Sequence, residues 1–356
     1  AEVDVKIRHG YAFRVKKAFE QQIEFQGVQV GDFQRISHQR PGARAAPRPY
    51  RNAVGFGPLD KIGDDEEISR EMFPGYPIHH ITNGVDSWTW TSDSFKDLYS
   101  QYITGWNNDP FLMRLAVCKP DEKIWQAHIE VKKNLLNFVK SETGINLSEE
   151  VLTIGFARRA TLYKRPLLIF SDILKLIDIT KKAGPVQFIF SGKAHPKDFE
   201  GKELIRQIIS LTKEIEEITI VYLENYDKDL AKLMVSGVDL WLNTPLRPLE
   251  ASGTSGMKAA HNGVPSFSIL DGWWLEGHIE GITGWSIGDN SDEINEEDSN
   301  SDAEDMYNKL ENTILPLFYK EREKWIGVMK YTIALNASFF NAYRMAQQYI
   351  TNAYFL

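Results

Sequence analysis

Hydrophobic and polar positions follow two different periods along this chain, and the pattern becomes regular after Pro74. Residues 92–105 and 121–140 carry apolar side chains at helical spacing, which predicts two amphipathic helices. Farther along, short apolar runs typical of buried strands take turns with longer amphipathic stretches typical of helices. We expect strands over residues 151–157, 186–192, 218–225, 238–243 and 264–270, and helices over residues 165–184, 199–217, 227–237 and 252–263.

This order of elements predicts the fold class. Strands that alternate with helices through short connections form an α/β domain with a doubly wound parallel sheet. In such a Rossmann-like sheet the loops that follow the strands emerge at one edge, where ligands bind. We expect residues 81–340 to form this domain and residues 341–356 to form a C-terminal helix.

Two segments depart from the pattern. Residues 38–51, HQRPGARAAPRPYR, are rich in Pro, Ala and Arg, which predicts an extended linker. We expect residues 1–80 as a whole to be an atypical remnant of an N-terminal domain with this linker. Residues 289–305 contain nine acidic and no basic residues, which predicts an exposed loop, and residues 306–355 have the pattern of two or three helices.

Composition and charge exclude several classes of protein. The chain has 356 residues, of which 42% are hydrophobic and 25% charged, as in an ordinary folded protein of about two domains. The net charge of −8 argues against general nucleic-acid binding, and no apolar run is long enough for a membrane-spanning helix. A single cysteine, Cys118, can form neither an internal disulfide nor a zinc cage. We therefore expect no metal site and a reducing, cytoplasmic compartment.

Three clusters of polar residues lie where the predicted loops meet the ligand-binding edge. The first follows the strand over 151–157 and contains Arg158, Arg159, Tyr163, Lys164 and Arg165. Cations at the start of a helix can bind an anion, and Arg contacts phosphate through two parallel hydrogen bonds. A solvated, basic helix start is the simpler interpretation.

The second cluster is EASGTSGMK, residues 250–258. Its glycines let the backbone approach a ligand, and successive amides can surround a phosphate. Lys258 would lie about one turn into the following helix, either as a charge beside the anion or as the partner of an aldehyde cofactor. A helix cap with a surface lysine is the alternative, and the order of residues is not that of a Walker A loop.

The third cluster is ITNGVDSWTW, residues 81–90. Asn83 offers a hydrogen-bond donor and an acceptor, as recognition of a sugar hydroxyl requires. Trp88 and Trp90 could line a pocket, although a turn with two core tryptophans has the same pattern.

Together these stretches resemble the α-glucan phosphorylase family, which includes glycogen, starch and maltodextrin phosphorylases. EASGTSGMK resembles the pyridoxal phosphate lysine segment of that family, and RRATLYKRP resembles its substrate-phosphate segment. ITNGVDSWTW, SGKAHP and LENYDKDLA also match in order, so the resemblance covers about residues 66–290. It implies the C-terminal catalytic half of an enzyme built from two Rossmann-like halves, with the active site between them.

The resemblance also implies roles for individual residues. Lys258 would hold pyridoxal 5'-phosphate as a Schiff base, and Arg159 and Lys164 would bind the substrate phosphate. The residues implied to surround the cofactor are Arg158, Thr254, Ser255, Gly256, Tyr226 and Trp90. The residues implied to contact the glucosyl unit are Asn83, Tyr163, Glu250, Ser252 and Gly253.

The implied reaction is phosphorolysis of a terminal α-1,4-linked glucose to glucose 1-phosphate with retention. The phosphate of the cofactor acts in it as a proton shuttle toward the substrate phosphate. The implied partners are an α-1,4-glucan and inorganic phosphate, and family members are often homodimers.

Two other interpretations stay open. Nucleotide-sugar glucosyltransferases of the same architecture also use an Arg and a Lys five apart, but commonly carry Glu-x7-Glu where this chain has Glu250 and Lys258. The second interpretation is a truncated or degenerate chain that binds the cofactor without catalysis. It stays open because residues 1–65 lack the glycine-rich loop and the histidine motif of the family's N-terminal half. We therefore expect cofactor binding, with weak or no phosphorolysis unless another polypeptide supplies the missing half.

Overall fold

The computed structural model describes residues 80–288 and 296–354. The chain divides into two compact units, Pro58–Tyr343 and Ala1–Gly57 with Arg344–Leu356. The sheet and the candidate site belong to the first unit. Of the second unit, the described part comprises residues 344–354, which form the end of one helix and a π-helical turn. The linker expected over 38–51 lies outside the described residues, and domain boundaries near 80 and 340 stay a prediction.

One sheet of six parallel strands organises the larger unit, in the order β3-β2-β1-β4-β5-β6. The strands are β1 (Leu152–Arg159), β2 (Val186–Lys193), β3 (Thr219–Leu223), β4 (Leu240–Asn243), β5 (Ser266–Ile269) and β6 (Gly284–Ile287). The order runs outward from β1 in one direction and from β4 in the other, so the topology changes direction between these two strands. The predicted doubly wound α/β fold is confirmed.

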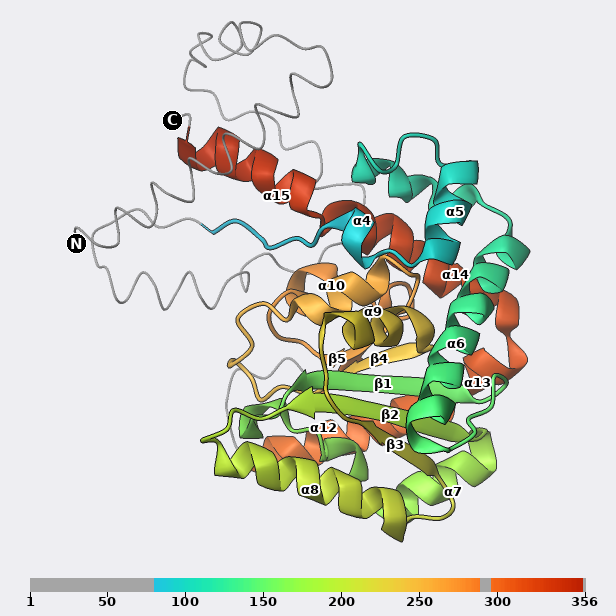
Figure 1. Cartoon of the computed structure of the whole chain (residues 1–356), viewed down its shortest axis with the longest axis vertical. Helices are drawn as coiled ribbons and strands as arrows, with labels where there is room; N and C mark the ends of the chain where they lie inside the picture. Colours follow the sequence, from blue (N-terminus) through green and yellow to red (C-terminus); the bar gives the residue numbers. More distant parts are fainter. Residues whose placement is uncertain (1–79, 289–295, 355–356) are drawn as a thin grey trace, which may run out of the picture. The chain divides into compact units, whose positions relative to one another are not determined.

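Helices cover both faces of the sheet. Figure 1 shows α9 and α10 on one side of the strands and α8 and α12 on the other. The α-helices are α4 (Ser87–Trp90), α5 (Asp93–Tyr102), α6 (Asp121–Thr143), α7 (Ile173–Ala183), α8 (Phe199–Glu214), α9 (Lys228–Gly237), α10 (Thr254–Ala260), α11 (Trp274–Gly277), α12 (Glu296–Lys309), α13 (Leu315–Lys320), α14 (Arg322–Tyr331) and α15 (Ala342–Tyr349). The shorter helices are the 3-10 segments η2 (Pro110–Cys118), η3 (Leu162–Lys164) and η4 (Leu168–Phe170) and the π segments η5 (Leu310–Ile314), η6 (Thr332–Ala337) and η7 (Ile350–Tyr354). Because helices lie over both faces, the central strands are buried on both sides and form continuous apolar runs.

Side-chain caps explain where several helices begin. Asp172, Asp198 and Asp227 each accept hydrogen bonds from backbone amides in the first turn of α7, α8 and α9. At the other end of a long helix, α6 stops at Gly144, whose φ of 74° lies in the left-handed region that glycine adopts readily.

The helix expected over residues 165–184 begins later than predicted. Arg165 has a left-handed φ of 41° and precedes Pro166, so the chain cannot continue as an α-helix there. Residues 162–170 form two 3-10 turns instead, and α7 starts at Ile173. This correction matters because the segment 162–170 carries Lys164, one of the residues predicted to bind phosphate.

Two further differences concern the C-terminal part of the unit. The acidic stretch predicted as a loop contains α12, and Asp302 on this helix is buried against Arg165. That ion pair joins residues far apart in the sequence, and no local pattern indicates it. The strand β6, Gly284–Ile287, was not predicted.

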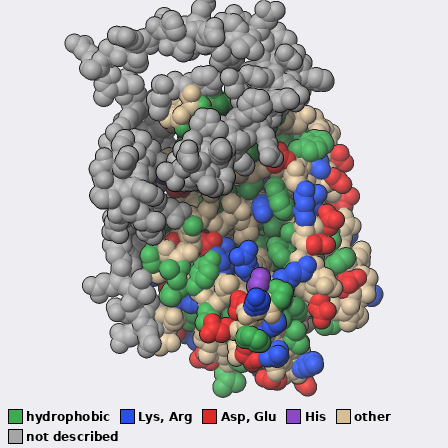
Figure 2. Space-filling model, turned by 60° about the vertical axis from the view of Figure 1, so that its left-hand side comes forward, with side chains coloured by type: hydrophobic (Ala, Val, Ile, Leu, Met, Phe, Trp, Pro, Cys, Tyr) green, Lys and Arg blue, Asp and Glu red, His purple; other side chains and the backbone are tan. Residues whose placement is uncertain are grey.

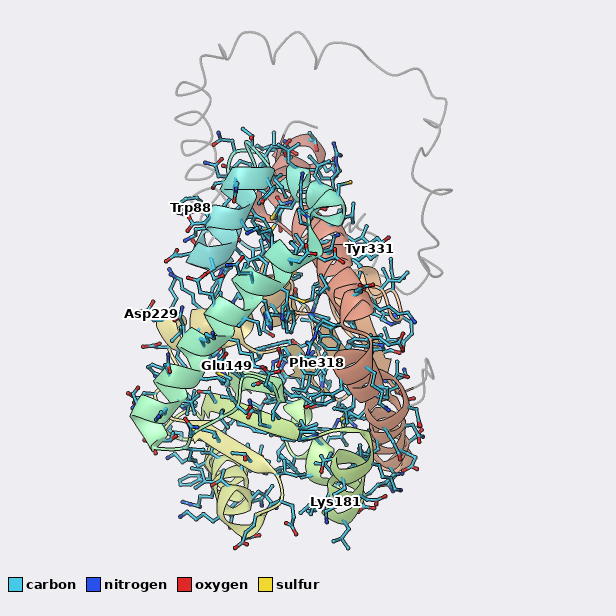
Figure 3. All side chains as sticks on the ribbon, turned by 90° about the vertical axis from the view of Figure 1, so that its right-hand side faces the viewer. Trp88, Glu149, Lys181, Asp229, Phe318 and Tyr331 are labelled. Carbon is cyan, nitrogen blue, oxygen red and sulfur yellow. The ribbon has the colours of Figure 1, made fainter. Side chains whose placement is uncertain are left out.

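The amino-terminal edge of the sheet is closed by helices. Figure 3 shows α6 crossing this side, with Phe318 between it and the C-terminal helices. The ring of Phe318 lies 6.3 Å from that of Trp125 on α6, at an angle of 63°. Ligands therefore have access to the sheet at its opposite, carboxyl edge.

Candidate active site

The candidate site lies at the carboxyl ends of β1 and β4, where the direction of the topology changes. Arg158 is the second-to-last residue of β1, and Asn243 is the last residue of β4. The strands point to the left in Figure 1, so their carboxyl ends come forward in Figure 2, where several Lys and Arg side chains lie on the surface. Ligands of open α/β sheets bind at this position.

Glu250 joins the two most enclosed cations of the site. Its Oε1 accepts a hydrogen bond of 2.8 Å from Nη2 of Arg158, and its Oε2 pairs with Nζ of Lys164. Lys164 is only 6% exposed, so the solvated basic helix start considered for this cluster is wrong. The carboxylate of Glu250 pairs with both cations, and we call this buried position, which an anion of the chain itself fills, the anion-binding position.

Backbone contacts hold the loop after β1 against the loop after β4. The amide of Leu246 donates to the carbonyl of Tyr163 at 2.6 Å, and the hydroxyl of Thr244 donates to the carbonyl of Lys164 at 3.0 Å. The Nζ atom of Lys164 also lies 4.2 Å from the ring centre of Tyr163. These contacts support the turn that carries Lys164, and the pairs of Glu250 with Arg158 and Lys164 bring the first and second predicted clusters together.

Lys258 is the fifth residue of α10, about one turn into the helix as predicted. Its amine is half-buried, and Nζ lies 4.1 Å from the ring centre of Trp90. Burial lowers the pKa of Lys258, which raises the fraction of neutral, nucleophilic amine. Gly253 precedes the helix with a left-handed φ of 71°, and this explains the need for glycine at that position.

Buried hydrogen bonds fix α4, which carries Trp90, against α10. The side chain of Asn262 donates to the carbonyls of Trp90 (2.8 Å) and Lys258 (3.2 Å) and accepts from the amide of Ser92 (2.7 Å). One residue earlier, Nε2 of His261 lies 3.0 Å from the hydroxyl of Ser87. The third predicted cluster thus meets the second.

The remaining predicted residues take different positions. Asn83 donates to the hydroxyl of Ser252 at 3.0 Å, and the hydroxyl of Ser255 accepts from the indole of Trp241 at 3.1 Å. Thr254 starts α10, and Gly256 is buried within it. Burial raises the pKa of Tyr226, and the positive charge of Arg158 opposes that rise.

Two predicted residues do not join these clusters. Arg159 is exposed at the end of β1, in register with Lys193 of β2, rather than within the buried Glu250 cluster. Trp88, considered as a pocket wall, is 53% exposed and stacks on Trp106 at 5.7 Å.

Sequence reasoning missed two residues that shape the anion-binding position. Asn243 accepts a hydrogen bond from Nη1 of Arg158, and Asp271 accepts from the amide of Glu250 at 2.9 Å. Both lie at the end of a predicted strand, at the edge where ligands bind. A search for polar residues at these positions would have found them.

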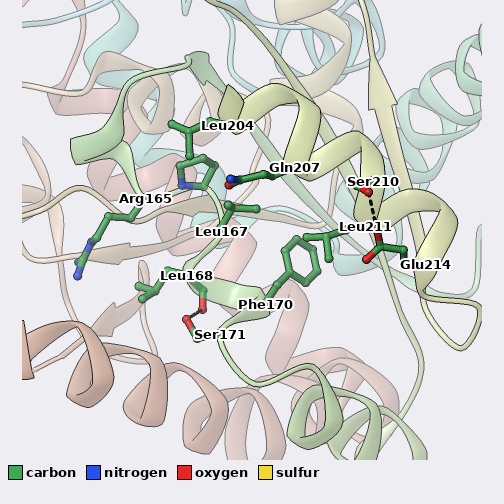
Figure 4. A pocket seen from close by; sticks show the side chains of 11 residues that line it. Arg165, Leu167, Leu168, Phe170, Ser171, Leu204, Gln207, Ser210, Leu211 and Glu214 are labelled. Carbon is green, nitrogen blue, oxygen red and sulfur yellow. Dashed lines mark hydrogen bonds between the residues drawn. The ribbon is translucent and has the colours of Figure 1, made fainter. Parts of the chain in front are cut away.

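A separate pocket of about 580 Å³ lies between α8 and the segment after η3 (Figure 4). Apolar side chains such as Leu204, Leu211 and Phe170 line it together with Gln207. It shares Arg165 with the loop that carries Lys164, but the residues predicted to bind cofactor or substrate do not line it.

Comparison with known proteins places this chain in a family. The sequence model of the family described as carbohydrate phosphorylase matches residues 70–354. The chain belongs to the carbohydrate phosphorylase family. It is 42% identical to a glycogen phosphorylase of Aquifex aeolicus, over 78% of this chain and 44% of that protein. It is also 42% identical to a maltodextrin phosphorylase of Thermococcus litoralis, over 81% of this chain and 38% of that protein.

A glycogen phosphorylase of Mycobacterium tuberculosis is 33% identical over 81% of the chain and 37% of its own length. The chain therefore spans less than half the length of these carbohydrate phosphorylases. In the described part of the chain no helix is long and apolar enough to cross a membrane, and no group of three or more His, Cys, Asp and Glu side chains could hold a metal ion.

Proposed function

We propose that this chain supplies the cofactor-binding part of an α-glucan phosphorylase, with pyridoxal 5'-phosphate bound through Lys258. The observation that carries the proposal is the half-buried amine of Lys258, held 4.1 Å from the ring of Trp90 and with a lowered pKa. An amine that is neutral more often reacts more readily with an aldehyde. The resemblance of the segment 250–258 to the family's lysine segment supports the same role.

The residues present fit this cofactor. Trp90 offers an aromatic face beside the amine, and Arg158 supplies a cation at the carboxyl edge of β1. The amides of Thr254, Ser255 and Gly256 lie in the first turn of α10, where backbone N–H groups have no partner within the helix. Amine, aromatic face, cation and free amides are the groups that a phosphorylated aromatic aldehyde requires.

The other cations would receive the substrate phosphate. Lys164 and Arg159 would bind and orient inorganic phosphate, and their charges would offset the repulsion between two phosphate groups at close range. When bound, the cofactor supplies a phosphate that exchanges a proton with the substrate phosphate. Lys164 lies in the buried cluster, so phosphate must replace the carboxylate of Glu250 there.

The glucosyl unit would be held by Asn83, Tyr163, Glu250, Ser252 and Gly253. The proposed reaction releases the terminal α-1,4-linked glucose as glucose 1-phosphate with retention. Two relatives named glycogen phosphorylase and one named maltodextrin phosphorylase support an α-glucan as substrate. A single cysteine suits the cytoplasm, and a homodimer stays a prediction.

Borohydride reduction tests the proposal. We expect reduction of the whole chain with pyridoxal 5'-phosphate to label Lys258 in a peptide map, while the variant Lys258→Arg, which keeps the charge, loses the label. Lys181→Arg, at a lysine on another helix, serves as the matched control and should keep it. Label on scattered lysines, or none, would contradict the proposal and favour either a degenerate chain that has lost its cofactor site or a nucleotide-sugar glucosyltransferase.

Turnover separates catalysis from cofactor binding alone. If the labelled chain forms glucose 1-phosphate from a maltodextrin and inorganic phosphate, it carries a complete site. Label at Lys258 without product would support a chain that needs the remainder of the phosphorylase for catalysis.

A further inference from the structure

Arg165 has a backbone conformation that its sequence does not favour. Of the described residues other than glycine, Arg165 and Asn225 have positive φ, at 41° and 57°. Asn adopts this left-handed region several times more often than most residues, whereas Arg has no such preference. Arg165 also precedes Pro166, which restricts its backbone further. Such a conformation persists only where surrounding contacts impose it.

The guanidinium of Arg165 makes those contacts on two separate segments. On the loop after β4, Nε donates to the carbonyl of Thr244 at 3.1 Å and Nη2 to that of Pro245 at 2.9 Å. On α12, Nη2 pairs with Asp302 at 2.6 Å and Nη1 donates to Ser299 at 3.1 Å. Figure 4 shows this side chain directed away from Leu204 and Gln207, so it leaves the pocket rather than filling it.

The loop after β4 also donates hydrogen bonds to the backbone of the turn. The hydroxyl of Thr244 donates to the carbonyls of both Arg165 (2.9 Å) and Lys164 (3.0 Å). The turn is therefore held both by the side chain of Arg165 and by the backbone carbonyls of Lys164 and Arg165. Lys164 is the last residue of η3 and directly precedes Arg165, and its Nζ reaches Glu250 in the buried anion-binding position.

We propose that Arg165 is a positioning residue for Lys164: its guanidinium, anchored on Asp302 and on the loop after β4, imposes the left-handed turn that directs Lys164 into the anion-binding position. This inference rests on the proposed function, in which Lys164 binds the substrate phosphate. Arg165 itself is committed to α12 and to backbone carbonyls, so it acts on phosphate through Lys164 and not by contact.

Calorimetric titration of the whole chain with inorganic phosphate tests the inference. Arg165→Lys keeps a charge for Asp302 but lacks the forked donors, and we expect it to weaken phosphate binding roughly tenfold, the effect of one charged hydrogen bond. Asp302→Asn leaves Arg165 in place without its ionic anchor and should weaken binding in the same direction. It also provides a second measurement if Arg165→Lys does not fold.

A double-mutant cycle distinguishes positioning from a general loss of structure. If Arg165 acts through Lys164, Lys164→Gln should weaken binding, and Arg165→Lys should add little once Lys164 is absent. Fully additive losses, or a lower melting temperature with unchanged phosphate affinity, would overturn the inference.

A matched control and the unaltered chain complete the test. Lys175→Gln removes another ion pair to α12, with Glu304, and should leave phosphate binding unchanged. If the unaltered chain binds no phosphate, the proposed function fails and the inference with it. If it binds and Arg165→Lys binds equally well, the inference alone fails.

Discussion

At the scale of single residues, the site is organised by charge balance. Arg158 and Lys164 are largely enclosed, and the carboxylate of Glu250 pairs with both. Burying two cations without an anion is costly, so the chain's own carboxylate stabilises the fold while no other anion is present. Phosphate can take over that role only when Glu250 moves.

Removal of this carboxylate should therefore make stability depend on phosphate. We expect Glu250→Gln to lower the free energy of unfolding by about 3–5 kcal/mol, because it leaves buried cations unpaired. Added inorganic phosphate should raise the free energy of unfolding of Glu250→Gln by more than it raises that of the unaltered chain. Denaturant titration with and without phosphate measures both effects.

The control for this prediction is Glu149→Gln. Glu149 pairs with Lys133 at 3.4 Å on the surface, and exposed pairs contribute little to stability. An equal response to phosphate in the two variants would show that Glu250 does not compete for the anion-binding position.

At the scale of elements, the environment of Lys258 depends on how α4 rests on α10. Asn262 connects the two through the carbonyl of Trp90 and the amide of Ser92, which lie some 170 residues away in the sequence. The Nζ atom of Lys258 lies 4.1 Å from the ring centre of Trp90, and burial lowers the pKa of Lys258. We therefore expect the contacts of Asn262, which hold Trp90 in place, to affect that pKa.

Asn262→Ala should raise the pKa of Lys258 toward its ordinary value, because Trp90 no longer keeps water from the amine. Other ionisable groups near these contacts are His261, the C-cap of α10, whose pKa burial lowers to about 4, and Asp86, the N-cap of α4. NMR of the reductively methylated chain, titrated with pH, measures the change directly.

A surface asparagine provides the matched control for this titration. Asn312→Ala removes a side-chain hydrogen bond to the carbonyl of Asn308 and should leave the pKa of Lys258 unchanged. An unchanged pKa in Asn262→Ala as well would mean that α10 by itself buries the amine.

At the scale of the whole molecule, a buried ionic cluster joins the sheet to α6 at the amino-terminal edge. Asp239, at the start of β4, pairs with Lys132 at 2.6 Å and with His128 at 2.8 Å and accepts from the amide of Thr153 at 2.7 Å. Burial raises the pKa of Asp239, but the charge of Lys132 and the bonds from His128 and Lys132 outweigh it, so the net pKa is lowered. This cluster is remote from the candidate site and stabilises the sheet itself.

The pH dependence of stability follows from that direction. A carboxyl whose folded pKa lies below its unfolded value of about 3.9 contributes fully at pH 7, and its contribution is lost as pH falls through the folded pKa. We expect Asp239→Asn to lower the free energy of unfolding by about 3–5 kcal/mol at pH 7, since it leaves Lys132 buried without a counter-charge. The difference from the unaltered chain should shrink below about pH 4.

Denaturant unfolding at pH 7 and pH 3.5 measures this difference. The control is Asp178→Asn, which removes an exposed ion pair with Lys182 on α7. Its free energy of unfolding should equal that of the unaltered chain at both pH values. If the difference in free energy of unfolding between Asp239→Asn and the unaltered chain is the same at both pH values, the contribution of Asp239 is not ionic.

Local pattern was sufficient for the strands and for most helices. Buried parallel strands are continuous apolar runs, and capped amphipathic helices have their own period, so β1 to β5, α6, α8 and α9 lie close to their predicted positions. The strand β6 was not predicted, and α7 begins at Ile173 rather than at residue 165. The pattern was insufficient where a distant contact decides the conformation. The turn at Arg165 replaces the start of a predicted helix because two distant segments, α12 and the loop after β4, hold Arg165. The residues next to Arg165 in the sequence give no sign of these contacts.

The sequence by itself determined the α/β fold and the kinds of residue at the site, because periodicity and short motifs are local properties of the chain. Only the tertiary structure decided which of those residues meet. Glu250 pairs with Arg158 and Lys164, 92 and 86 residues away, and Lys258 lies over the ring of Trp90, whose carbonyl Asn262 contacts. The order of strands places β1 beside β4, and that order depends on packing of the whole sheet rather than on any segment within it.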